Sequence, residues 1–154
     1  MPRAAASPSG LLEPAVTFTA FSHDATCMAT VELRPDSGTG DATSGLKFWE
    51  ADTSALGPAA YTVNTLLEDP HGGPVESLAF HPSEFVAVTA GTSCRDGSGE
   101  FRVWVRQPHK RAPGARRGGG NCHWRCRSVA SYKGVFSAAV MFSGSTVDVK
   151  IPNM

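Results

Sequence analysis

Three short runs of alternating apolar residues, enclosed between a His-Gly turn at His71 and a tryptophan at Trp104, constrain the fold most strongly. The runs are rich in β-branched and aromatic residues and are separated by Gly, Pro and Ser, as expected of strands joined by turns. The strand-forming residues are Val75, Leu78 and Phe80, then Val86, Val88 and Thr89, then Phe101, Val103 and Val105. Strands this short and this closely spaced predict one antiparallel blade of a β-propeller, which is built from four such strands.

The same order of parts occurs once more upstream and begins again near the end of the chain, which marks it as a repeat. The upstream copy contains Val16, Phe18 and Phe21, then Met28 to Val31, then Leu46 to Trp49. A further copy begins with Ala138, Val140 and Phe142 but shows no recognisable second strand. The sequence therefore predicts an all-β fold: incomplete β-propeller blades, about two of them plus the start of a third.

The repeats are widely spaced, because the phenylalanines that end the first strands, Phe21, Phe80 and Phe142, lie 59 and 62 residues apart. A standard blade takes roughly 40 to 45 residues. Two polar insertions account for the excess, and we expect both to be loops. The predicted organisation is a disordered N-terminus at 1–15, two blades at 16–106 with a loop at 34–44, a basic Gly/Arg/Pro-rich loop at 107–122, and a truncated further blade at 123–154.

Two segments outside the common blade pattern, YTVNT at Tyr61–Thr65 and WRCRSVASYKG at Trp124–Gly134, resemble the WD repeat-containing protein 75 family. Further similar pieces, in the same order, are MATVELRP, LKFWE, DPHGGPVESLAFHP and EFRVWV. The resemblance implies the opening blades of the second propeller of a nucleolar WD-repeat protein, and therefore a fragment or a truncated gene product. It also implies a non-enzymatic scaffold that acts in pre-ribosomal RNA transcription and processing, with other small-subunit processome proteins as partners.

The resemblance further implies a structural hydrogen-bond network of the WD type, made by His71, Thr89, Asp96 and Trp104. The acid of such a network usually lies six residues before the tryptophan, where this chain has Ser98, whereas Asp96 lies eight before it. Either a two-residue bulge restores the bond or the network is incomplete. The first blade lacks a matching histidine, so we expect it to depend on apolar packing. A general acid-base role for His71 is the alternative.

The chain has no net charge, with 14 basic and 14 acidic residues, yet its basic residues are unevenly placed. Nine of them lie from Arg102 to Lys133 with no acid between them. The candidates for contacts with the phosphates of pre-ribosomal RNA are Lys110, Arg111, Arg116 and Arg117. The same residues also suit a solvated loop or a weak nuclear-import signal, which fits a protein of the nucleus and nucleolus.

Other classes of function find little support. Cys122 and Cys126 flank His123, but the fourth ligand that a zinc site requires has no candidate at the usual spacing. Nucleophile-elbow, metalloprotease and phosphate-loop motifs are missing, and no run approaches eighteen apolar residues. We therefore expect no enzyme, cofactor, metal, small-molecule substrate or membrane partner. Trp124 is expected either in the outer strand of the next blade or exposed at a loop end, and an unfolded product without function stays a third possibility.

Overall fold

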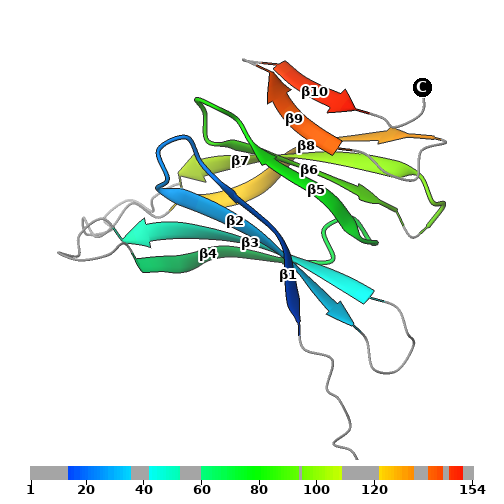
Figure 1. Cartoon of the computed structure of the whole chain (residues 1–154), viewed down its shortest axis with the longest axis horizontal. Helices are drawn as coiled ribbons and strands as arrows, with labels where there is room; N and C mark the ends of the chain where they lie inside the picture. The colour runs from blue at the N-terminus through cyan, green and yellow to red at the C-terminus, as the bar shows by residue number, and fades with distance from the viewer. Residues whose placement is uncertain are drawn as a thin grey trace, which may run out of the picture.

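The computed structural model describes residues 14–35, 42–52, 60–93, 95–108, 122–133, 139–143 and 146–150. All regular structure in these ranges is β-strand (Figure 1). The strands are β1 Ala15–Phe21, β2 Cys27–Pro35, β3 Ala42–Asp52, β4 Ala60–Glu68, β5 Val75–Phe80, β6 Val86–Thr92, β7 Gly99–Pro108, β8 Cys122–Tyr132, β9 Ala139–Ser143 and β10 Thr146–Lys150. The described residues include no helical segment with the length and hydropathy that a membrane crossing requires.

The strands form two four-stranded antiparallel sheets, in the orders β1-β2-β3-β4 and β5-β6-β7-β8, followed by the hairpin β9-β10 (Figure 1). Strand order within each sheet follows chain order, so each sheet is a simple meander. Strand β5 contacts both β1 and β9, and β4 contacts β8. First strands therefore neighbour first strands and last strands neighbour last strands, which is the arrangement of successive propeller blades. The described residues do not close a ring.

The sheets lie face to face on a core that both blades supply. The first blade contributes alternate residues of β2 and β3, and the second contributes one residue from each of its four strands. The buried residues are Cys27, Ala29, Val31, Leu46, Phe48, Val75, Ala87, Trp104 and Trp124. A smaller group on the opposite face of the second blade, centred on Val88 and Ala90, packs with Phe142 of β9. The second blade is thus covered on both faces, by the first blade and by the hairpin.

Aromatic stacking dominates the contact between the first two blades. The ring of Phe48 lies parallel to that of Trp124, with centroids 4.4 Å apart, and 6.1 Å from that of Trp104. The indole N–H of Trp124 is buried without a hydrogen-bond partner among the described residues. The indole side chain of Trp124 is therefore held by packing alone.

Polar contacts reinforce the same interface at its edge. The Arg106 guanidinium donates to Glu50 Oε1 of the first blade at 2.8 Å and lies over the ring of Phe85. Asn64 and Thr65 of β4 bond the backbone of β8, through Cys122 O at 2.7 Å and Trp124 N at 3.0 Å. The YTVNT segment thus joins the outer strands of the two blades.

Three of the sequence-based predictions need correction here. The segment 123–154 does not simply start a further blade, since β8 completes the second sheet and its Trp124 is buried. A second strand does follow β9, because Val147 and Val149 alternate with polar residues in β10, which pairs with it antiparallel.

The third correction concerns the loops, both of which are shorter than predicted. Residues 34–35 and 42–44 are paired strand, as are Gln107, Pro108 and Cys122. Residues 36–41 and 109–121 lie outside the described residues, as do 1–13 of the predicted disordered N-terminus, and β1 already includes Ala15.

Replacing Trp124 by Ala should lower the free energy of unfolding by about 3 to 5 kcal/mol, because it removes a buried aromatic side chain from the interface. Trp124→Phe is the matched control. It keeps a ring against Phe48 and removes the unpaired buried N–H, so we expect it to change stability far less. Urea unfolding of the unchanged protein and the two variants measures both effects. Equal decreases in the free energy of unfolding for the two variants would contradict the stacking role of Trp124.

Candidate functional site: a buried hydrogen-bond network beside a polar cavity

A threonine hydroxyl in the middle of β6 joins two buried ring side chains of the second blade, His71 and Trp104. The Thr89 Oγ1 atom lies 2.8 Å from Nε2 of His71 and accepts a 2.9 Å hydrogen bond from the indole N–H of Trp104. All three side chains are buried. The structure thus brings together three of the four residues that the resemblance indicated for a WD network.

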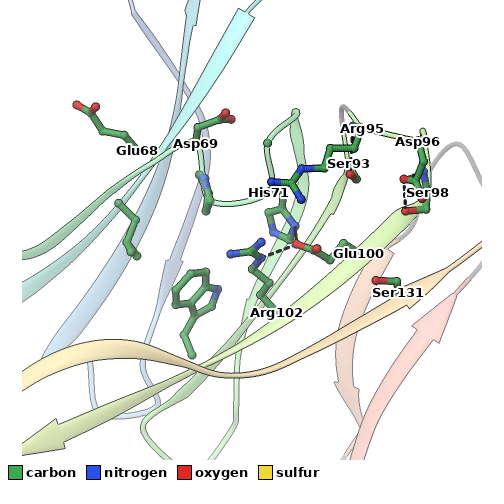
Figure 2. A pocket seen from close by; sticks show the side chains of 14 residues that line it. Glu68, Asp69, His71, Ser93, Arg95, Asp96, Ser98, Glu100, Arg102 and Ser131 are labelled. Atoms are coloured by element: carbon green, nitrogen blue, oxygen red, sulfur yellow. Dashed lines mark hydrogen bonds and ion pairs between the residues drawn. The ribbon is translucent and has the colours of Figure 1, made fainter.

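Asp96, the fourth predicted member, lies elsewhere. Its carboxylate is on an exposed turn and accepts hydrogen bonds from the backbone and hydroxyl of Ser98. The acid that faces the histidine is Glu100, whose Oε1 lies 3.1 Å from Nδ1 of His71 (Figure 2). The usual spacing before the tryptophan indicated position 98, occupied by Ser98, or the nearby Asp96. Strand β7 begins only at Gly99, so Glu100 is the first residue of the strand with a side chain that can face the histidine.

One tautomer of His71 suits all three of its polar neighbours. If Nδ1 carries the proton, it points at the Glu100 carboxylate, and Nε2 accepts from the Thr89 hydroxyl, which in turn accepts from Trp104. The opposite tautomer would set a lone pair against a carboxylate. The contact with Glu100 is close but is not an aligned hydrogen bond, and the same Glu100 oxygen also pairs with Arg102 Nε. The arrangement holds the imidazole as a structural element.

A glycine makes room for this imidazole. Gly91 of β6 pairs with Glu100 across the strands, and a Cβ at position 91 would lie 2.7 Å from both His71 Cγ and the carbonyl oxygen of Pro74. Real Cβ atoms do not approach other atoms that closely. Gly91 is therefore required by the close approach of the histidine and not by its own backbone angles.

Burial lowers the pKa of His71 from 6.5 to about 4, against the opposing effect of the Glu100 carboxylate and with a smaller contribution from Arg102. The neutral imidazole is thus the form that the fold selects at pH 7. A group this far from its ordinary pKa can indicate a catalytic site, but here both ring nitrogens face framework partners.

The first blade carries half of the same network, so it does not depend on apolar packing alone as predicted. The Trp49 indole donates a 2.9 Å bond to Thr30 Oγ1, and these two residues occupy the register positions of Trp104 and Thr89. In both blades an acid on one strand faces a glycine on the other, but the acid lies on the second strand in the first blade and on the third strand in the second blade. Glu32 faces Gly45 in the first blade, whereas Gly91 faces Glu100 in the second, and a cation pairs with the acid in both.

The network borders a polar cavity of about 560 Å³ at one end of the contact between the blades (Figure 2). Both acidic and basic side chains line it, and His71 and Trp104 lie in its wall. The charged residues of the lining are Glu68, Asp69, Arg95, Asp96, Glu100 and Arg102. Two of these charges neutralise each other directly, Glu100 with Arg102, and the described residues contain no group of His, Cys, Asp or Glu that could hold a metal ion.

The four candidates for RNA contacts, Lys110, Arg111, Arg116 and Arg117, lie outside the described residues. Other members of the basic segment have structural partners: Arg102 pairs with Glu100, and Arg106 joins the blades through Glu50. Cys126 packs against the core, and Cys122, like Cys126 and Cys27, is a free thiol.

Comparison with known families gives one result for nearly the whole chain. Residues 5–151 match a family model described as the second β-propeller of WD repeat-containing protein 75. Among curated proteins, no sequence matches the chain. The matched range covers both four-stranded sheets and the hairpin β9-β10.

Thr89→Val should cost about 2 to 4 kcal/mol of stability, because it leaves two buried polar groups, the indole N–H of Trp104 and Nε2 of His71, without their shared partner. Thr30→Val, the equivalent change in the first blade, removes a single bond to the half-buried Trp49 and should cost less. Thr89→Ser keeps the hydroxyl and serves as the control. Thermal or urea unfolding ranks the three variants, and a cost for Thr30→Val equal to that for Thr89→Val would contradict the double role of Thr89.

Stability should fall as the pH is lowered from about 6.5 to about 4. In that window the unfolded chain binds a proton at residue 71 that the folded chain rejects, because the folded pKa of His71 is depressed. Above the window the full stabilisation is present. His71→Asn cannot titrate, so the difference in unfolding free energy between pH 7 and pH 4.5 should be smaller for this variant. An unchanged pH dependence would show that His71 is not the responsible group.

Proposed function

Because the chain belongs to the WD repeat-containing protein 75 family, as part of its second β-propeller, we propose that it is a non-enzymatic scaffold of ribosome biogenesis. It acts in pre-ribosomal RNA transcription and processing by holding protein partners of the small-subunit processome. Its site of action is the nucleolus within the nucleus. The match over residues 5–151 carries this proposal.

The geometry of the blades supports a scaffold more than a catalyst. The His71 imidazole, the best-placed general base by sequence, is held between Thr89 and Glu100 inside the framework. Rigid meanders leave turns, outer strand edges and blade faces as the surfaces available to partners. Such surfaces bind by shape and charge and require no cofactor or small-molecule substrate.

A second candidate is direct binding of pre-ribosomal RNA through the basic segment 109–121, with the blades as its platform. The nine basic residues between Arg102 and Lys133, uninterrupted by an acid, favour it. Flexible arginines and lysines neutralise phosphates without reading bases, so binding of this kind is strongly salt-dependent. Lys110, Arg111, Arg116 and Arg117 are its proposed contacts.

The two candidates separate in one experiment on the full chain, tagged and expressed in eukaryotic cells. A protein scaffold should accumulate in nucleoli and sediment with small-subunit precursor particles, and its contacts with processome proteins should survive ribonuclease treatment. The variant with Ala at positions 110, 111, 116 and 117 should keep those contacts. Loss of association in this variant or after ribonuclease would favour the RNA-binding loop. A folded chain that stays diffuse and sediments alone would overturn both.

A further inference from the structure

The outer edge of the second sheet is covered at one end and open at the other. Strand β8 pairs with β7 along one side. On its other side, the side chains of Asn64 and Thr65 satisfy the backbone of Cys122 and Trp124. These contacts from the first blade end there.

From residue 126 to residue 132 the outer backbone of β8 has no such cover. Within the described part of the chain, the backbone of these residues bonds only to β7, apart from a local contact of the Cys126 thiol with the carbonyl oxygen of Ser128. In an antiparallel ladder every second residue turns its N–H and C=O away from the partner strand. Residues 127–131 are exposed, with Val129 52% accessible. The open edge is therefore a row of donors and acceptors beside small and β-branched side chains.

The charged side chains that β8 and the residue after it supply to this edge are all basic. Arg125, Arg127 and Lys133 are exposed, and none of them forms an ion pair with a described acid. Lys133 acts on Asp96 only at longer range, and it depresses the pKa of that carboxyl less than the hydrogen bonds from Ser98 do. The two arginines of β7 within the sheet are already paired with Glu100 and Glu50.

We propose that the edge of β8 from Cys126 to Tyr132 binds an extended, acidic segment of a partner protein, which adds a fifth strand to the second sheet. Backbone bonds provide the affinity in this mode of recognition, and side chains provide the selectivity. A second copy of this chain is a poor occupant, because pairing two such edges would bring like charges together. The proposal deepens the scaffold function and rests on it for the identity of the partner as a protein.

Single-stranded RNA would meet the same cations but has no regular row of amide groups to match the strand edge. The uncharged stretch Ser128–Ser131 at the centre of the edge offers backbone groups and no cation. A strand of alternating glutamate and apolar residues uses both features: its backbone pairs with this stretch, and its carboxylates reach Arg127 and Lys133.

The test uses the full ¹⁵N-labelled chain and an octapeptide of alternating glutamate and valine. We expect shifts and slowed amide exchange at residues 128–132. Arg127→Ala should weaken binding about threefold, as for one exposed charge pair, whereas Arg95→Ala, an exposed arginine on the β6–β7 turn, should not. Two further peptides carry N-methyl groups on one or the other set of alternate residues. One of them should bind at least about tenfold more weakly, because its bonds to the edge are blocked.

Equal binding of all three peptides would overturn the proposal, as would equal effects of the two arginine variants. Preferential perturbation of the same residues by an oligouridine, with no response to the peptide, would assign the edge to RNA instead. A chain that enters nucleoli and sediments with precursor particles, yet fails the peptide test, would refute the strand-edge site while leaving the scaffold function intact.

Discussion

The packing of Phe48 between Trp104 and Trp124 is the contact on which the other features of the structure depend. A four-stranded sheet cannot bury both of its faces by itself, so each blade needs a neighbour. This contact provides it for the first two blades. It keeps water from Trp104 and therefore from the hydroxyl of Thr89 that the indole binds, and it positions β4 close enough for Asn64 to bond the start of β8.

Comparison of the two blades shows which part of the polar network they share and which part differs between them. Both blades retain a threonine on the second strand bonded to a tryptophan on the third. The acid changes strand, from Glu32 in the first blade to Glu100 in the second, and the histidine occurs in the second alone. The hydroxyl-to-indole bond is thus common to both sheets, while the histidine adds a connection to the turn before β5 where the blade is buried on both faces.

Strand positions were largely predictable, because period-two alternation and turn residues act locally: Val75 to Phe80 and Val86 to Thr89 lie in strands where the pattern indicated them. The acidic partner of His71 was not predictable in this way. Which acid faces the imidazole depends on the register between β6 and β7, and counting back from Trp104 led to Asp96 instead of Glu100. The place of Trp124 was missed for a similar reason, since a fourth strand and a first strand have the same local pattern and differ only in the strand with which they pair.

The sequence by itself determined the kind of sheet, the repeat and the family, because these depend on residue order and on short motifs such as YTVNT and WRCRSVASYKG. Tertiary structure alone decided which residues meet: Glu100 with His71, Asn64 with Cys122, and Phe48 with Trp124. Within the described residues, it also decided which part of the β8 edge stays open. Pairs of this kind join different strands, and the Asn64 and Phe48 contacts join different blades. Strand register and blade packing bring these residues together, and both are set by the burial of whole sheet faces. A local sequence pattern therefore does not predict these pairs.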